Sequence, residues 1–185
     1  QSINKVFTEI YDAWNSDTFF SLIKAFELPT NNQIKTFSRG MRMKAALTIA
    51  LSHDAKLLIL DEATAGMDVS GREHVLEILE DYLGDDRAIL ISSHISEDIE
   101  QLATQLVFMR DGRIILKESK EVLLSQYGII DQPVEHFNIS NEYLIATRRR
   151  NDRQISLVNN YQKVPDAQPL KTIDDATKII MRGEV

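Results

Sequence analysis

Cysteine is absent from the 185-residue sequence, and glycine and proline are scarce, with seven and four residues. A chain without cysteine cannot form a disulfide scaffold, and such chains are common in the cytosol. No apolar run approaches the ~18 residues that a membrane-spanning helix needs. The first residues, QSINKVF, lack the apolar segment of a signal peptide. These absences predict a protein that folds without disulfides and without membrane-spanning helices.

Basic residues are also in the minority, because 21 lysines and arginines face 28 aspartates and glutamates. The formal net charge of −7 argues against a nucleic-acid-binding surface, which is normally basic. The hydrophobic content of 43% is ordinary for a globular protein with a hydrophobic core. The composition therefore predicts a folded, acidic protein and excludes an intrinsically disordered one.

The most informative stretch is KLLILDEATAGMD, residues 56–68. Its apolar run, 57–60, predicts a strand that is covered on both faces, as in a parallel α/β sheet. Asp61 and Glu62 follow at the carboxyl end, where such sheets bind ligands. Neighbours on a strand point to opposite faces, so the two acids are predicted to have different tasks. A buried strand that ends in a solvated acidic turn is the alternative that this stretch alone leaves open.

Two further stretches carry chemistry. The sequence FSRGM, residues 37–41, begins a helical pattern, and the apolar run ILISSH, residues 89–94, ends in His94. Ser38 and Gly40 at a helix start would offer a hydroxyl and unpaired N–H groups to a phosphate oxygen. Simple N-capping by Ser38 is the alternative. His53, His74 and His136 have no comparable setting, and no role is predicted for them.

In order, FSRGM, LLILDE, AGMD and SSH resemble the signature, Walker B, D-loop and switch-histidine motifs of the ATPase subunits of ABC transporters. The resemblance covers roughly residues 5 to 128 and is strongest to ATPases of Gram-positive exporters of antibiotics and related peptides. It implies an α/β fold: a partial P-loop NTPase core with a helical subdomain. The residues after 128 depart from that core and predict a small C-terminal α/β appendage. Arg39, Met41 and Ala63 depart from the family's commonest glycine, glutamine and proline.

The resemblance also implies roles for individual residues. Glu62 would be the general base, His94 would contact the γ-phosphate, and Asp61 would hold Mg²⁺, through water. The nucleotide-binding positions would be Ser38, Arg39, Gly40, Met41 and Asp68. Of these, Ser38 and Gly40 would act on ATP held by a second ATPase subunit in a nucleotide-sandwich dimer. The other implied partner is a transmembrane permease subunit, which would keep the protein cytoplasmic and peripheral at the inner face of the cell membrane.

The sequence contains no G-x-x-x-x-G-K-[ST] motif, the loop that holds the phosphates in such ATPases. In the family this loop precedes the signature motif, so the chain is expected to be the C-terminal part of a longer subunit. We expect it to bind ATP and Mg²⁺ weakly, to be inactive alone, and to self-associate through an open strand edge at 88–91. Closure of that edge by residues 106–109 is the alternative. Two other functions stay open: a non-catalytic interaction module and a DNA-associated ABC-type ATPase.

Three parts are predicted along the chain: 1–54, a helical subdomain with the signature motif; 55–128, a remnant of the RecA-like core; and 129–185, an accessory region. In the first, Phe19, Leu22, Ile23 and Phe26 form one apolar helix face that Ser16 or Asp17 would cap. In the second, Ser70–Glu73 has capping-box spacing for a helix that Gly84 would end.

Local signals continue into the last part. Asp111-Gly112 predicts a β-hairpin, and Gly128 is expected to stop a helix that ends near Tyr127. Strands at 142–147 and 154–158 are expected around a basic turn that contains Arg148, Arg149 and Arg150. This turn is either a solvated hairpin tip or a contact to anionic lipid or a partner. Thr172 would cap a last helix.

Overall fold

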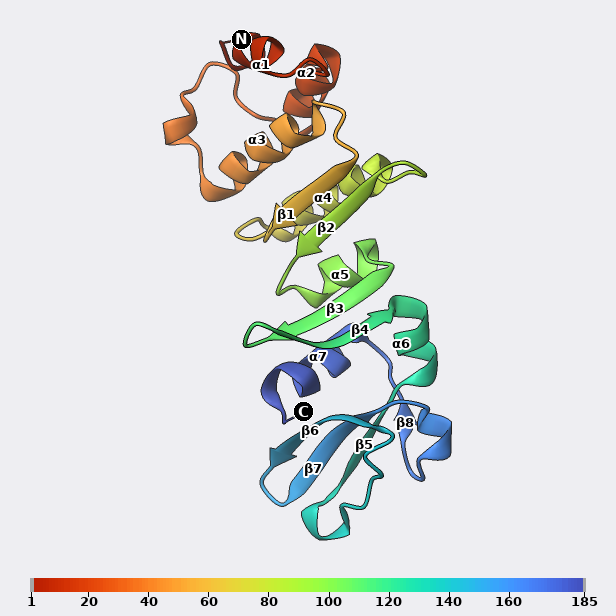
Figure 1. Cartoon of the computed structure of the whole chain (residues 1–185). Helices are drawn as coiled ribbons and strands as arrows, with labels where there is room; N and C mark the ends of the chain where they lie inside the picture. Colours follow the sequence, from red (N-terminus) through yellow and green to blue (C-terminus); the bar gives the residue numbers. More distant parts are fainter. Residues whose placement is uncertain (1, 185) are drawn as a thin grey trace. The chain divides into compact units, whose positions relative to one another are not determined.

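The computed structural model describes residues 2–184 of the chain (Figure 1). Contacts between residues divide the chain into two compact units, residues 1–98 and 99–185. Each unit has its own secondary structure and its own buried residues. The predicted division into 1–54, 55–128 and 129–185 stays a prediction.

Helices dominate the N-terminal part of the first unit: α1 (Ser2–Ile10), α2 (Ser16–Ala25), the 3-10 turn η1 (Ile34–Thr36) and α3 (Arg39–Leu51). The predicted apolar face of α2 is confirmed, since Phe19 and Phe26 are buried. The predicted cap, Ser16 or Asp17, is wrong by one residue. Asn15 has an extended backbone, and its Oδ1 accepts the N–H of Thr18 at 2.9 Å. An asparagine in that conformation is among the best N-caps, so the helix begins directly after it.

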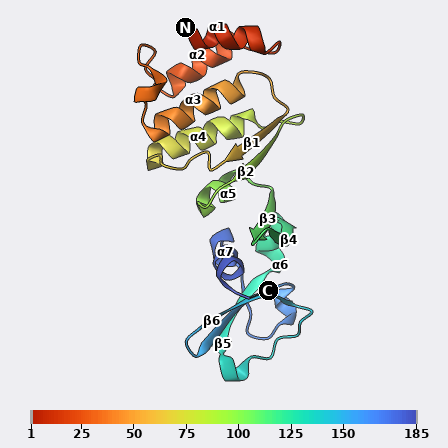
Figure 2. The ribbon, with the colours of Figure 1, turned by 60° about the vertical axis from the view of Figure 1, so that its left-hand side comes forward.

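The predicted strands around the acidic stretch are β1 (Leu57–Asp61) and β2 (Ala88–Ser92), which pair in parallel. Between them in sequence lies α4 (Val69–Tyr82), and Figures 1 and 2 both show it next to α3 and β1. Its buried residues include Val75 and Leu79, each fully enclosed. The parallel pair therefore has a helical layer on one side.

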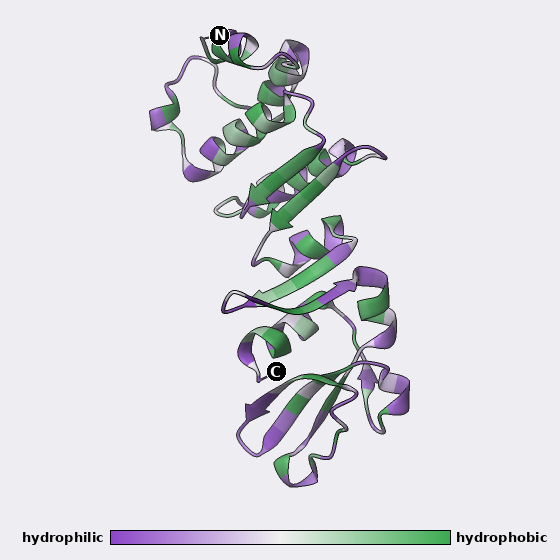
Figure 3. Ribbon diagram, viewed as in Figure 1, coloured by the Kyte–Doolittle hydropathy of each residue, from purple (hydrophilic) through white to green (hydrophobic). Residues whose placement is uncertain are grey.

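The expectation that β1 is covered on both faces is wrong for this structure. Leu58 is buried, whereas its neighbours Leu57 and Ile59 are 54% and 71% exposed. Leu90, the register partner of Ile59, is 60% exposed. The two strands are apolar up to their last residues, Asp61 and Ser92 (Figure 3). Within residues 2–98, the side chains of one face thus pack inward, while those of the other face point to solvent.

The start of α4 also differs from the prediction. Asp68 caps the helix, because its Oδ1 accepts the N–H of Gly71 at 3.2 Å. The predicted capping box at Ser70–Glu73 is therefore wrong, and the helix begins two residues earlier than that box implies. A side chain at Gly71 would collide with this carboxylate, since a Cβ there would lie 2.6 Å from Oδ1. The helix ends at Tyr82 with Leu83 as its C-cap, one residue before the predicted stop at Gly84.

A short helix, α5 (Ser96–Leu102), spans the boundary between the units, and the second unit continues with the hairpin β3 (Gln105–Arg110) and β4 (Arg113–Ser119). The predicted hairpin is confirmed. Asp111 and Gly112 both have positive φ angles, 51° and 73°, which tight two-residue hairpin turns require. The hairpin leads into α6 (Lys120–Gln126).

A four-stranded antiparallel sheet follows, in the order β6-β7-β5-β8. Its elements are β5 (Gly128–Pro133), β6 (Leu144–Arg150), β7 (Arg153–Val158) and β8 (Gln168–Pro169), with short 3-10 turns η2 (Val134–His136) and η3 (Tyr161–Lys163) and the last helix α7 (Ile173–Arg182). Thr172 caps α7 as predicted, accepting the N–H of Asp175 at 3.2 Å. Helix α6 ends near Tyr127 as predicted, with Tyr127 as its C-cap, and Gly128 begins β5. It lies so close to Tyr161 and Gln168 that a side chain there would collide with both.

The core of the second unit joins the hairpin, α6, the sheet and α7. Its most enclosed side chains are Leu123, Leu157, Ala176 and Ile180. The predicted basic turn is only partly correct: the three arginines lie within β6, and the turn itself is Asn151-Asp152. In the part of the chain that the structure describes, no helix is both long and apolar enough to cross a membrane.

Candidate functional site

The acids and the histidine meet at the carboxyl ends of β1 and β2. The parallel register places Asp61 opposite Ser92. The Ser92 hydroxyl donates to Asp61 Oδ1 at 2.5 Å, and its backbone oxygen accepts the N–H of Glu62 at 3.0 Å. Sequence reasoning gave Ser92 no role, although it is the first residue of the SSH motif. These two contacts of Ser92 hold Asp61 and Glu62, at the end of β1, against the end of β2.

Glu62 has a left-handed backbone, with φ at 52°. Such a conformation is uncommon for a residue with a side chain and is found more often at functional sites. It directs the carboxylate toward the loop after β2, where Glu62 Oε2 lies 2.5 Å from His94 Nδ1. The side chain of Glu62 is 37% exposed and that of His94 is 72% exposed. The pair is therefore ordered by its own contact while it stays accessible to a substrate.

The signature residues lie at the start of α3. Ser38 is its N-cap, and the Ser38 hydroxyl accepts the N–H of Met41 at 3.2 Å. Gly40 lies against the D-loop, because a Cβ there would come within 3.6 Å of the Gly66 carbonyl oxygen. Ser38 and Arg39 are exposed and Gly40 is partly buried. Ser38 thus caps α3, and the N-terminus of this helix is also accessible to a ligand.

Two groups of predicted site residues emerge. One contains Asp61, Glu62 and His94, and the other joins 38–41 to the D-loop. Asp68 is predicted to bind nucleotide, and in this structure its carboxylate caps α4. Among residues 2–184, no hydrogen bond or ion pair links the two groups.

The fit of Mg²⁺ can be tested on the acids alone. No cluster of three or more histidines, aspartates or glutamates capable of holding a metal ion exists in the described part of the chain. Mg²⁺ in nucleotide sites does not need one, since it keeps several waters and binds one or two carboxylates plus substrate phosphates. Asp61 is exposed and held by a single serine hydroxyl. It fits such a one-carboxylate site.

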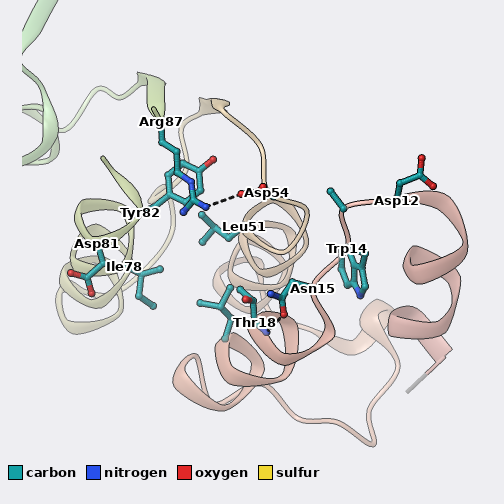
Figure 4. Close-up of a pocket in the computed structure, with 12 residues that line it drawn as sticks. Asp12, Trp14, Asn15, Thr18, Leu51, Asp54, Ile78, Asp81, Tyr82 and Arg87 are labelled. Carbon is teal, nitrogen blue, oxygen red and sulfur yellow. Dashed lines mark hydrogen bonds and ion pairs between the residues drawn. The ribbon is translucent and has the colours of Figure 1, made fainter. Parts of the chain in front are cut away.

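A cavity of the first unit lies elsewhere (Figure 4). It has a volume of about 600 Å³, and its lining includes Trp14, Asp54, Asp81, Tyr82 and Arg87. Arg87 pairs with Asp54 at 2.7 Å and stacks over the Tyr82 ring. Asp54 and Arg87 precede β1 and β2, so this cavity is at the amino ends of the strands. The predicted site residues are at the opposite ends.

Comparison with known proteins agrees with the motif order. Residues 5–65 match the family model described as ABC transporter. The resemblance to ABC transporter ATPases is confirmed. The lantibiotic transport ATP-binding protein SrtF of Streptococcus pyogenes is 37% identical over 116 residues, which is 63% of this chain and 47% of that protein.

Two further relatives come from Bacillus subtilis. The linearmycin resistance ATP-binding protein LnrL is 32% identical over 120 residues, covering 63% of this chain and 38% of the relative. The ABC transporter ATP-binding protein NatA is 32% identical over 93 residues, covering 50% and 38%. The chain therefore spans about half the length, or less, of the curated relatives that it matches.

Solved structures show the same fold. A putative cobalt transport ATP-binding protein superposes with a TM-score of 0.56 at 19% identity, covering 79% of this chain and 53% of that one. A dimeric bacterial ABC transporter cassette gives a TM-score of 0.51 at 18% identity, covering 56% and 46%. At these identities the likeness concerns the fold alone. The predicted α/β fold of an ABC ATPase fragment is confirmed.

Proposed function

We propose that the chain is part of the ATP-binding, ATP-hydrolysing subunit of an ABC transporter that exports peptides, toxins or drugs. The observation that carries this proposal is the contact between Glu62 and His94 at the end of β1. It joins the predicted base to the predicted switch residue, and both side chains stay accessible. Relatives named for lantibiotic transport and linearmycin resistance support the exporter class.

Hydrolysis depends mainly on positioning and charge neutralisation. Glu62 would accept a proton from the attacking water, a task that typically contributes ~10²–10⁴-fold to a rate. His94 would hold the Glu62 carboxylate in place and contact the γ-phosphate. Asp61, oriented by Ser92, would hold Mg²⁺, which when bound supplies positive charge to the phosphates.

Ser38 and Gly40 would act on nucleotide held by a second ATPase subunit. The exposed start of α3 offers a hydroxyl, backbone N–H groups and the positive end of a helix dipole, which together suit a phosphate oxygen. Binding of ATP between two subunits would drive a transmembrane permease from one state to another. The subunit would then lie on the cytoplasmic side of the membrane, held there by the permease.

The proposed activity belongs to the complete subunit. The 185 residues contain no G-x-x-x-x-G-K-[ST] motif, so the phosphate-holding loop and its lysine would come from outside them. Residues 1–185 alone are therefore proposed to be inactive, with weak affinity for ATP and Mg²⁺.

The test is an ATPase assay on the complete subunit that carries this segment, with and without His94→Ala. We expect Mg²⁺-dependent hydrolysis that falls by at least about 100-fold in the variant, in line with loss of acid–base positioning. His53→Ala is the matched control, because His53 lies before β1 and contacts Ile49 of α3 and Tyr11, which follows α1. Equal rates in all three proteins would contradict the proposal. Stimulation by DNA would favour a DNA-associated ATPase, and no ATP binding would favour an interaction module.

A further inference from the structure

Asp98, in the first turn of α5, is a fully buried carboxylate that the motif analysis did not single out. A buried charge is costly unless partners surround it. Its Oδ2 accepts hydrogen bonds from the hydroxyl of Thr64 and, at 3.2 Å, from that of Ser93. Its Oδ1 faces Arg72 Nε at 3.6 Å. The side chain thus has three partners from three different segments of the first unit.

Each of these partners lies within four positions of a predicted site residue. Thr64 follows Glu62 by two positions in the turn after β1. Ser93 directly precedes His94, and its hydroxyl also accepts the N–H of Ile95 at 3.0 Å. The Ser93 hydroxyl therefore contacts both Asp98 and Ile95, the residue that follows His94.

The third partner extends the network to the D-loop. Arg72 is in the first turn of α4, the helix that Asp68 caps. Its side chain is 24% exposed, and within the described residues its Nε makes the ion pair with Asp98 but no hydrogen bond. Asp98 therefore connects the turn of Glu62, the loop of His94 and the helix behind the D-loop through one carboxylate.

We propose that Asp98 is a positioning residue that holds Glu62 and His94 in their contact. Only the predicted effect of Asp98 on ATP hydrolysis rests on the proposed function of the site. Asp98 does not reach substrate, because no part of it is exposed. It acts through Thr64, in the turn after Glu62, and through Ser93, which directly precedes His94. Its Oδ2 accepts two hydroxyl hydrogen bonds, whereas its Oδ1 has the ion pair with Arg72 but no hydrogen bond. Buried hydrogen bonds of this kind favour one local arrangement.

A first experiment uses the 185-residue chain and does not depend on ATP. An ionised carboxylate can only accept a hydrogen bond, so the contact to Glu62 requires a proton on His94 Nδ1. The ring ¹⁵N chemical shifts report this tautomer, and His94→Ala assigns the signal among the four histidines. We expect Asp98→Asn and Thr64→Val to move the His94 signals toward those of a free imidazole, while the other three histidines keep theirs.

The matched control is Thr48→Val. Thr48 is as buried as Thr64, but its hydroxyl donates to the Lys44 carbonyl within α3. It tests whether any lost buried hydroxyl disturbs His94. Unchanged His94 signals in folded Asp98→Asn and Thr64→Val, or equal changes in Thr48→Val, would overturn the proposal. Thr64→Val and Ser93→Ala provide the answer if Asp98→Asn does not fold.

A second experiment uses the complete subunit. Asp98→Asn and Thr64→Val should lower kcat about tenfold or more with little change in KM, the pattern of a lost transition-state arrangement. Thr64→Ser, which keeps the hydroxyl, should restore most of the rate. A rise in KM alone, or no rescue by Thr64→Ser, would overturn the positioning role. An unchanged ATP hydrolysis rate in Glu62→Gln would instead refute the proposed function. The ¹⁵N chemical shifts would still test whether Asp98 positions His94.

Discussion

Glu62 Oε2 lies 2.5 Å from His94 Nδ1, although 32 positions separate these residues in the sequence. The parallel pairing of β1 with β2 produces this contact, because it places the ends of both strands at one edge. The left-handed backbone of Glu62 then turns its side chain toward the histidine. The contact gives the site a defined base and a defined partner for it before any substrate is bound.

Replacement of the base gives the first prediction. In the complete subunit, Glu62→Gln should nearly abolish ATP hydrolysis and leave ATP binding intact, because the amide keeps the size but cannot accept a proton from water. Hydrolysis rate and equilibrium ATP binding are the two measurements. Glu73→Gln is the control, since Glu73 is an exposed residue of α4. Hydrolysis within a few-fold of the unmutated rate would rule out Glu62 as the base.

The role of Ser38 in a second subunit gives the next prediction. A mixed dimer that carries Ser38→Arg in one subunit should lose one of its two ATP sites, because the bulky cation would block the phosphate-facing helix start. Single-turnover hydrolysis by the mixed dimer should then show half of the sites active. ATP-induced dimerisation of two mutant subunits should fail.

The competing explanation of Ser38 is a simple helix cap. Loss of a cap costs ~1 kcal/mol and acts within each subunit. Ser119→Ala is a matched control, because Ser119 caps α6 with a 3.1 Å hydrogen bond to the Val122 N–H. Ser38→Ala and Ser119→Ala should lower the melting temperature alike, and only Ser38→Ala should weaken ATP-induced dimerisation. Normal dimerisation of the Ser38→Arg protein would refute the role in trans.

Tyr127 gives a pH prediction for the second unit. Burial of the phenol, and secondly the charge and hydrogen bond of Glu118, raise the pKa of Tyr127 to about 12 from an ordinary value of 10. The raised pKa means that the unfolded chain releases this proton first. The associated stability is therefore complete below pH 10 and is lost as the pH rises from 10 to about 12. The loss is at most about 3 kcal/mol.

Tyr127→Phe separates this effect from other alkaline titrations. The variant should be less stable at neutral pH, because the bond to Glu118 is lost, and it should lose less stability between pH 10 and 12. Urea unfolding at several pH values measures both quantities. Parallel stability curves for the two proteins across that pH range would contradict the assignment.

Local sequence signals predicted most of the elements. The Asp111-Gly112 turn, the Thr172 cap and the strand before Asp61 were all predictable, because short-range geometry determines them. The motif order likewise predicted that Glu62 and His94 belong to one site. Errors occurred where one polar residue competed with a neighbour, as when Asp68 rather than Ser70 capped α4.

The rest of the site depends on tertiary contacts. Asp98 is an ordinary acid in a polar stretch of sequence, and nothing local shows that it is buried against Thr64 and Ser93. Gly128 follows the helix end as predicted, but its close approach to Tyr161 fixes its place at the start of a strand. Such positions are defined by residues distant in the sequence, which periodicity and capping rules do not address.

Nucleotide affinity of the chain itself gives a further prediction. The 185 residues should bind Mg-ATP only weakly, because they include no glycine-rich loop that surrounds a phosphate with N–H groups. Calorimetric titration measures this affinity. A parallel titration of the complete subunit measures the Mg-ATP affinity of the complete site for comparison. Micromolar affinity of the 185-residue chain would contradict the prediction.

Self-association is the final prediction, and it follows from the exposed strands of the first unit. β2 pairs with β1 on one edge, and in the described residues no strand lies on its other edge. Residues 106–109, the alternative partner for that edge, lie in β3, which pairs with β4. Unpaired edges recruit further strands, often from a second copy of the same chain.

The open face next to that edge strengthens the expectation. Ile59 and Leu90 are register partners, and both are mostly exposed. Contact between two such faces would remove apolar surface from water at ~25 cal/mol per Å². We expect light scattering to show dimers or larger species that increase with concentration, and Ile59→Lys with Leu90→Lys to restore the monomer. Val69→Lys, at an equally exposed valine of α4, should leave association unchanged. A monomer at the highest concentration measured would refute the prediction, and equal effects of all three lysines would point to charge rather than to this face.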